Sequence, residues 1–304
     1  MVSHRRGWET SATSTARHGR LTLARRRSLA GFLFVVPGIV PLLIFVGYPM
    51  LSALYLSFTN WALMGAPQLQ GISTYTNLFA DQQFRTALIV TLEIAIGTAV
   101  PSCLLALGVA LLFNARARFT AWYQPLFFLP AVLPTVVTTI VWGILYQGNG
   151  VVNSLFGLNV AWLTDARWAL PALVIMILWT NLGYYAVILL AGLRDVPADY
   201  YEAARIDGAG PLALLWHITL PLIRPALLFV LVTATSGALT LFVQPYLLTA
   251  GGPGDATRTL SELIYDTAFS YLNIGKATAM SFILLVLSLL IAFLQFRLLS
   301  PKDT

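Results

Sequence analysis

The sequence predicts an all-α protein, a polytopic membrane helix bundle with six transmembrane helices. Of its 304 residues, 58% are hydrophobic and only 10% are charged, whereas soluble domains carry about 25% charged residues. Apolar runs of about 20 residues recur, and each could cross a bilayer core of about 30 Å. In lipid every backbone N–H and C=O must be paired internally, so spans are helices or closed barrels. The runs are continuous rather than alternating, which excludes a barrel.

Six segments are long and apolar enough to be spans, and each lies between more polar stretches. The chain divides into a basic N-terminal tail (1–28), expected to be disordered, a membrane domain (29–299) and a short cytoplasmic tail (300–304). Four prolines within the spans, Pro37, Pro41, Pro130 and Pro134, are expected to kink helices. The six expected spans are roughly 29–58, 85–113, 119–146, 168–193, 222–248 and 277–296.

The distribution of basic residues predicts the orientation. With the N-terminus in the cytoplasm, 14 of the 18 Lys and Arg residues fall on the cytoplasmic side, as the excess of basic residues in cytoplasmic loops requires. Both termini are therefore expected inside a bacterial or archaeal cell (inner) membrane. The outside loops would be 59–84, 147–167 and 249–276. The net charge of the chain is +6, and its basic residues lie beside the spans. Lipid rather than nucleic acid is therefore the expected partner.

Several classes of chemistry are not expected. Cys103 is the single cysteine and lies in an apolar run, and no His-rich cluster is present, so no metal site is predicted. A phosphate-binding loop would read G-x-x-x-x-G-K-[ST], but Gly275-Lys276 is followed by Ala277. The chain is therefore not expected to hydrolyse ATP, to bind a cofactor or to contain catalytic residues.

The most informative segment is the cytoplasmic loop 195–225, which predicts a short helix, a turn and a second helix. Asp195 or a neighbour can cap the first helix, with Pro197 in its first turn. Gly208 can take the left-handed conformation that ends it, and Pro211 opens the second helix. Two later prolines limit this helix and return the chain to the membrane.

The first helix of this loop contains the small residues Ala203 and Ala204. Small side chains permit another surface to approach closely, which favours a docking element. A helix lying on the bilayer is the alternative, and physical reasoning alone leaves both open.

Residue identities in the loop decide between these alternatives. The pattern resembles the EAA signature of binding-protein-dependent ABC importer permeases, in which the loop forms coupling helices seated in a cleft of the ATPase subunit. The resemblance implies that Glu202, Ala203, Ala204, Asp207, Gly208 and Ala209 contact an ATPase. The matching residues are Glu202, Ala203, Ala204, Asp207, Gly208, Ala209, Ile218, Leu220, Pro221 and Pro225.

A second resemblance points to the carbohydrate-uptake branch of that family. Residues 246–253 read YLLTAGGP, and the stretch leading into the last span continues the match. Val243 and Gln244 stand where members often carry an acidic residue, so the sugar itself is not specified. The further matching residues are Thr257, Thr259, Tyr265, Phe269, Gly275 and Ala279.

The resemblance also implies a set of partners. A second permease subunit, giving a heterodimer, would complete the pathway between the two chains. Two ATPase domains would dock from the cytoplasm and would use ATP and Mg²⁺. A substrate-binding protein outside the membrane would deliver a sugar-like solute, and ATP-driven closure would produce alternating access.

Polar and aromatic residues inside the spans are candidates for the pathway. Sugars are bound by aromatic faces and by side chains that donate and accept hydrogen bonds, although such residues also hold helices together in lipid. Glu93 either lines the pathway or is structural, since a carboxylate at membrane depth is costly. The candidates are Asn181, Tyr185, Gln244, Trp142 and Glu93.

Three alternatives stay open. A glycerol-3-phosphate or glycerophosphodiester importer is the nearest, but no cation cluster accompanies the polar set. A secondary transporter would usually show paired broken helices or a coupling-ion site, and neither is evident. An intramembrane enzyme would need clustered acidic or His residues near one membrane face, and the acidic residues outside the loop are spread out.

Overall fold

The computed structural model describes residues 28, 31–32, 34–63, 65–114 and 120–299. The N-terminal tail apart from residue 28, the C-terminal tail and residues 115–119 lie outside this description, so the expectations for them stay predictions. The chain divides into two units, Met1–Tyr55 and Leu56–Thr304. The expected division into tails and one membrane domain is not tested by these units, and each unit is described by itself.

The first span is one helix, Phe34–Leu56, with no residue of its most apolar window buried. It contains a π-helical turn, η1 (Leu43–Gly47), followed by α2 (Tyr48–Leu56). The turn comes directly after Pro41, and the missing N–H of a proline is a common reason for such a local change of winding. The helix nevertheless continues through both predicted kink sites, Pro37 and Pro41, without a break.

In the second unit, α4 (Gln82–Asn114) packs against α8 (Ala166–Arg194) and α12 (Arg224–Leu239). The last long helix, α15 (Ile274–Leu299), packs against α12. Small residues at helix interfaces let backbones approach closely in a membrane, and α4 presents a buried stripe of them at helical spacing. The stripe comprises Ala87, Ala95, Ala99, Ala106 and Ala110.

The third span is broken rather than continuous, which corrects the expected single helix over 119–146. The span consists of two helices, α5 (Thr120–Val132) and α6 (Thr135–Leu145). The chain bends by 103° between Gln124–Val132 of α5 and α6. The break falls at Pro134, which has extended backbone (ψ 132°) and precedes α6, so the kink predicted there is confirmed. Pro130 lies inside α5.

The fifth span also differs from the expected helix over 222–248. Pro211–Leu222 (α10, Pro211–Leu214; η2, Leu215–Thr219; α11, Leu220–Leu222) is bent by 70° from α12. Thr240 then ends α12, and α13 (Val243–Leu248) follows as a separate helix. The apolar stretch is uninterrupted in sequence, but the freed carbonyl of Leu241 accepts a hydrogen bond from Thr259 Oγ1 at 2.9 Å, so the break leaves this buried group satisfied.

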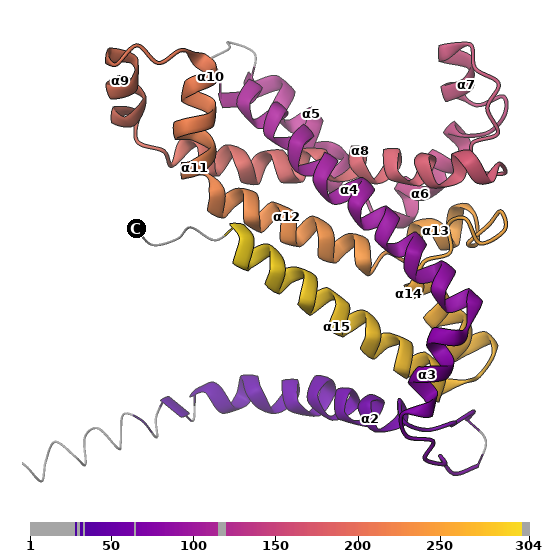
Figure 1. The fold of residues 1–304 in the computed structure, drawn as a ribbon. Helices are drawn as coiled ribbons and strands as arrows, with labels where there is room; N and C mark the ends of the chain where they lie inside the picture. The colour runs from indigo at the N-terminus through magenta and orange to yellow at the C-terminus, as the bar shows by residue number, and fades with distance from the viewer. Residues whose placement is uncertain (1–27, 29–30, 33, 64, 115–119, 300–304) are drawn as a thin grey trace, which may run out of the picture. The chain divides into compact units, whose positions relative to one another are not determined.

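The connecting loops contain short helices. They are α3 (Ser73–Ala80), α7 (Val151–Phe156), α9 (Ala198–Ile206), α14 (Leu260–Tyr265) and the π-helical η3 (Asp266–Ser270). Within the second unit, Figure 1 places α9 and the C-terminal end of α15 toward one end, and α3, α7, α13 and α14 toward the other. The all-α prediction is confirmed. Four helices of the described residues are long and apolar enough to span a membrane, and the number of candidate spans rises to six when each bent pair counts as one.

Candidate functional site

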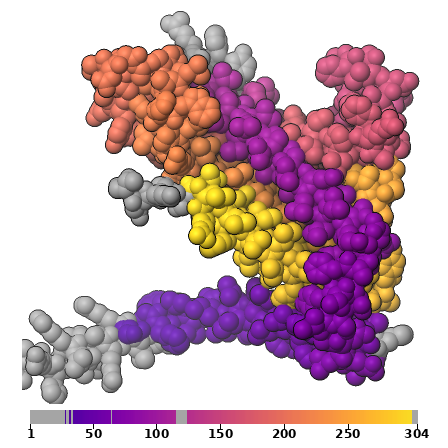
Figure 2. All heavy atoms as spheres, in the orientation of Figure 1, coloured from indigo at the N-terminus to yellow at the C-terminus, as the bar shows by residue number. Residues whose placement is uncertain are grey.

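The loop between α8 and α12 forms an exposed helical hairpin, defined here as residues 198–222. No residue of α9 is buried, and Figure 2 shows the hairpin in orange as a protruding part of the second unit. Large apolar side chains on it are open, with exposed fractions of 86% for Ile206, 73% for Leu212 and 63% for Trp216. Contiguous exposed apolar surface commonly marks an interaction site.

Backbone hydrogen bonds fix the end of α9. Gly208 has φ +82°, the left-handed conformation predicted for it. Its N–H donates to the carbonyl of Arg205 at 3.1 Å, and the N–H of Ala209 donates to the carbonyl of Ala204 at 2.9 Å. These two bonds form a complete Schellman motif, which satisfies carbonyls that the helix end would otherwise leave open. Gly208 is therefore required by the turn geometry.

The start of α9 differs from the expected cap. Asp195 is the residue that ends α8, and its side chain makes no cap for α9. Pro197 instead occupies the capping position itself, with extended backbone (ψ 137°) and no side-chain hydrogen bond. Pro211 opens α10 as predicted.

One contact links the two limbs of the hairpin, and another joins α8 to α12 at its base. Tyr201 Oη lies 3.2 Å from Thr219 Oγ1, and Thr219 is buried in η2. At the foot of the hairpin, a Cβ placed on Gly192 of α8 would lie 2.8 Å from the Cβ of Ala226 in α12. Such close approach leaves little room for α8 and α12 to slide past each other. A displacement of α9 would reach η2 through the contact between Tyr201 and Thr219, and α12 through the chain that follows η2.

The candidate pathway residues divide into two groups. Asn181, Tyr185 and Gln244 line one cavity of about 160 Å³ between α4, α8, α12 and α13. Gln244 was expected inside the fifth span, whereas it lies on α13 beyond the break. The amide Nδ2 of Asn181 donates to the carbonyl of Ile177 at 3.0 Å, which leaves its Oδ1 able to accept another bond.

Thr98 and Ser102 also line this cavity and escaped the sequence analysis. Both are almost fully buried on α4. Their spacing of four residues puts them on one helix face, but Ser and Thr are common in membrane helices, so the spacing alone did not distinguish them. Thr98 Oγ1 donates to the carbonyl of Ile94 at 2.7 Å.

Trp142 and Glu93 do not join this group. The ring centroid of Trp142 lies 5.0 Å from that of Tyr146 and 5.5 Å from that of Trp179, so it packs in an aromatic cluster. Glu93 is exposed and lines a different, open hollow of about 440 Å³ with Arg167 among its neighbours. Their geometry separates both residues from the cavity at Asn181.

A buried acid in the loop before α15 was also missed. Glu262 is 1% exposed, and its Oε2 has no hydrogen-bond partner among the described residues. Burial raises the pKa of Glu262 to about 7; the positive charge of Arg258 opposes this, and the nearby Asp266 and Asp255 add to it. Thr259 at the start of α14, followed three residues later by Glu262, is a capping-box pattern that could have drawn attention to it.

The same loop is held against the bundle by buried threonines. Thr91 Oγ1 on α4 accepts from the N–H of Leu260 at 2.8 Å, and Thr259 Oγ1 reaches Leu241 as described above. Thr257 Oγ1 lies 2.6 Å from Thr249 Oγ1 and donates to the carbonyl of Gly252 at 2.8 Å. These bonds give a structural reason for the threonines noted in the second resemblance.

Comparison with known proteins defines the class. Residues 102–302 match the family described as binding-protein-dependent transport system inner membrane component. The chain is 33% identical to the probable ABC transporter permease protein YesP of Bacillus subtilis (strain 168), covering 90% of this chain and 91% of that one. It is 31% identical to the lactose transport system permease protein LacF of Rhizobium radiobacter, covering 91% and 96%.

The fold has a counterpart among solved structures. A chain of a bacterial ABC transporter involved in the import of the acidic polysaccharide alginate aligns with a TM-score of 0.80 at 22% identity, covering 94% of this chain and all of that one. At this identity the likeness shows the fold. The chain belongs to the binding-protein-dependent transport system inner membrane component family, and it is a permease subunit of an ABC importer. This excludes the secondary transporter, even though two spans are broken.

Proposed function

We propose that this permease takes up a neutral carbohydrate by alternating access and forms its pathway together with a second, similar permease subunit. Two separate ATPase domains dock on the 198–222 hairpin from the cytoplasm, where both termini lie, and they use the ATP and Mg²⁺ that this chain does not bind. A binding protein outside the membrane delivers the solute. Lactose and multiple-sugar permeases among the relatives support the solute class.

The observation that carries the solute class is the cavity at Asn181. Its described lining combines amide and hydroxyl groups, from Asn181, Gln244 and Tyr185, with apolar side chains and contains no Lys or Arg. A phosphate group is normally held by cations or by clustered backbone N–H groups, so this lining favours a neutral sugar over glycerol-3-phosphate or a glycerophosphodiester. The volume of about 160 Å³ is that of one chain, and the second permease would complete the site.

The hairpin carries the coupling role. Glu202 and Asp207 are exposed and offer polar contacts, Ala203 is exposed and small, and Gly208 and Ala209 complete the turn. An incoming surface would meet these groups together with Ile206. Closure of the ATPases then moves α9, and the contact of Tyr201 with Thr219 carries that movement to η2 and along the chain into α12. The helix α8 follows because its Gly192 packs against Ala226 of α12.

Reconstitution tests the proposal. The permease pair, its ATPases and its binding protein are placed in liposomes, and uptake of labelled neutral di- and trisaccharides is compared with uptake of labelled glycerol-3-phosphate. The proposal expects ATP-dependent uptake of a neutral sugar and none of the phosphate ester. Uptake of glycerol-3-phosphate alone would contradict the solute class, while uptake without ATPase subunits would contradict the coupling role.

A further inference from the structure

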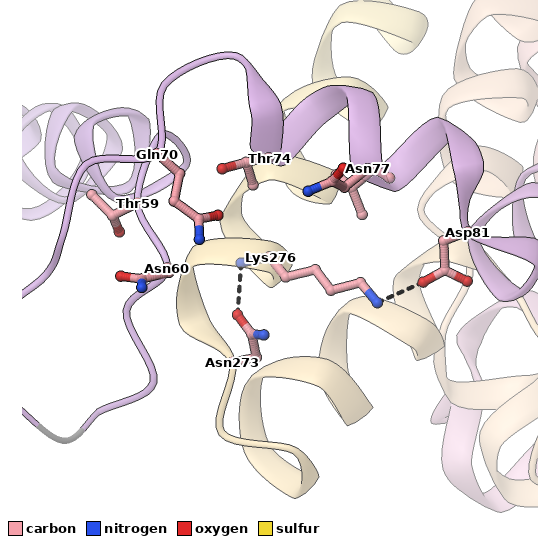
Figure 3. Close-up of a pocket in the computed structure, with 9 residues that line it drawn as sticks. Thr59, Asn60, Gln70, Thr74, Asn77, Asp81, Asn273 and Lys276 are labelled. Carbon is pink, nitrogen blue, oxygen red and sulfur yellow. Dashed lines mark hydrogen bonds and ion pairs between the residues drawn. The ribbon is translucent and has the colours of Figure 1, made fainter.

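A second polar hollow lies toward the end of the second unit opposite the hairpin. Residues of the loop 59–72, of α3 and the following Asp81, and of the stretch 273–276 line a hollow of about 330 Å³. Figure 3 shows their side chains arranged around the space. This volume lies at the lower end of the range for small-molecule pockets, about 300–1,000 Å³. The hollow shares no described lining residue with the cavity at Asn181.

The walls of this hollow are fixed in place by close contacts. The N–H of Gly275 donates to the carbonyl of Trp61 at 3.0 Å, and a Cβ on Gly275 would lie only 2.1 Å from the carbonyl oxygen of Thr59. Lys276 Nζ lies 2.6 Å from Asp81 Oδ2, which ties α15 to the start of α4. The loop and both helices are thus joined before any ligand arrives, and preorganisation of this kind favours binding.

The lining contains polar groups that the protein itself leaves unused. Thr74 is only 7% exposed, and its Oγ1 has no hydrogen-bond partner among the described residues. A buried hydroxyl without a partner costs free energy. The side chains of Gln70 and Asn77, which line the same space, also make no hydrogen bond within the described part of the chain. Gln70 and Asn77 are exposed and Thr74 is buried, so hydrogen-bonding groups without a protein partner come from two segments to one space.

The charge of the lining restricts the ligand. Asp81 and Lys276 neutralise each other, and the carboxylate also accepts from the N–H of Gln83 at 2.8 Å. Burial alone would raise the pKa of Asp81, but the hydrogen bond from Lys276 and the contact with Gln83 outweigh it and lower the pKa. The pair therefore stays ionised at neutral pH and adds no net charge. The other described lining residues are amides, threonines and Leu78.

This combination fits a neutral molecule that carries several hydroxyl groups. Each hydroxyl both donates and accepts, so it can pair with the amides, with the Thr74 hydroxyl and with the ion pair alike. No aromatic ring is among the described lining residues, so hydrogen bonds rather than ring stacking would hold the ligand. A sugar unit satisfies these conditions, and an anion or an apolar molecule does not.

We propose that this hollow is a second saccharide-binding site, separate from the membrane pathway. On the predicted orientation it opens to the outside of the membrane, where it would hold a terminal unit of a neutral sugar near the entrance. The choice of sugar as occupant rests in part on the proposed function, whereas the hollow, its free hydrogen-bonding groups and its charge balance do not.

The test uses the assembled transporter in lipid nanodiscs. Asn181→Leu and Gln244→Met are introduced first to weaken the pathway cavity, and an array of neutral mono-, di- and trisaccharides is screened by saturation-transfer NMR. Thr74→Val keeps the shape of the side chain and removes a hydroxyl that has no partner, so it should leave folding intact. We expect it to weaken binding of the selected saccharide by about 5-fold to 10-fold.

Thr76→Val is the matched control, because Thr76 lies on the same helix, is exposed and is not among the described lining residues. It should leave binding unchanged. Equal effects of the two variants, or no saccharide bound by the pathway-weakened transporter, would overturn the second site. Protection of Asn77→Cys from thiol reagents by the binding protein without sugar, and not by sugar alone, would overturn it too, since the hollow would then be a protein contact.

Sugar uptake by the otherwise unaltered transporter is measured in parallel. If a neutral sugar is imported but Thr74→Val and Thr76→Val bind it equally, the second site fails and the proposed function stands. If only glycerol-3-phosphate is imported, the proposed function fails, and the hollow is still judged by saccharide binding.

Discussion

The 198–222 hairpin and the cavity at Asn181 are built in opposite ways. The hairpin is exposed, and the bonds that shape its turn join residues at most five positions apart, as in the Ala209 to Ala204 bond. The cavity is largely buried and takes its lining from residues between Thr98 and Gln244. A docking surface can thus be encoded locally, whereas a solute site between helices depends on packing over the whole domain.

The largest effect is expected from reversing a charge on the hairpin. Glu202→Lys should insert normally, because Glu202 is exposed, yet it should reduce ATP-driven uptake by roughly 100-fold if the carboxylate is desolvated against the ATPase. Membrane yield and uptake in liposomes are the measurements. Full uptake with normal yield would remove the hairpin from the coupling role.

The turn itself provides a sharper test. Gly208→Asp places a side chain at φ +82°, where a residue with a Cβ costs about 1–2 kcal/mol, so uptake should fall by about 10-fold. Gly210→Asp is the control, since Gly210 has φ −77° and open space around it. Equal losses in both variants would indicate that added charge, and not backbone geometry, is responsible.

Changes in the cavity should affect affinity and leave coupling intact. Asn181→Leu and Gln244→Met keep the volume and remove hydrogen-bonding groups, so each should raise the half-saturating sugar concentration by about 5-fold to 10-fold. Thr180→Val removes a hydroxyl from the neighbouring position, outside the described cavity lining, and should change little. Loss of basal ATPase activity in the two cavity variants would contradict this, because the cavity would then affect coupling as well as affinity.

A smaller effect is expected from the buried acid on α14. The pKa of Glu262 rises from its ordinary 4.5 to about 7, so the folded state binds the proton more tightly than the unfolded state. Its contribution to stability is therefore complete below pH 4.5 and is lost as the pH rises through 7. Glu262→Gln should raise the melting temperature at pH 8 by several degrees and have little effect at pH 5.

Thermal unfolding of the purified complex at the two pH values measures this. Asp195→Asn, which changes an exposed carboxylate outside the hairpin, serves as the control and should leave the melting temperature unchanged at both. A stabilisation by Glu262→Gln that is equal at pH 5 and pH 8 would mean that ionisation of Glu262 is not its cause.

The smallest effect concerns the contact between the two limbs of the hairpin. Tyr201→Phe removes the contact with Thr219, which still donates to the carbonyl of Leu214 at 3.2 Å, so the loss should be about 0.5–1 kcal/mol. Uptake should fall by about 2-fold to 5-fold. Tyr200→Phe is the control, because Tyr200 is 54% exposed and its hydroxyl makes no hydrogen bond within the described residues. Equal uptake in both variants would mean that this bond does not transmit movement.

The difference between the two regions also explains what the sequence could predict. The left-handed Gly208, the start at Pro211 and the break at Pro134 follow from the backbone limits of glycine and proline, which act within a few residues. The end of α12 at Thr240 could not be predicted in this way, because Thr259, 19 positions further on, satisfies the carbonyl that the break exposes.

The cavity was predicted in part for the same reason. Asn181, Tyr185 and Gln244 stand out as polar groups in apolar stretches, but only the packing of α4 against α8 and α12 brings Thr98 and Ser102 to them. Trp142 and Glu93 stand out in the sequence in the same way, but the tertiary structure places them away from the cavity. Glu262 was overlooked because its burial depends on how the loop folds over it.

Crosslinking from Ala203 tests the central claim most directly. Ala203→Cys places a thiol on the exposed α9, and a short thiol crosslinker is applied to the assembled, transport-active complex. The predicted result is a covalent product between this chain and the ATPase subunit that changes in yield when ATP is added, while Thr76→Cys, toward the other end of the unit, gives none. Failure of Ala203→Cys to capture the ATPase in a complex that still transports would contradict the account.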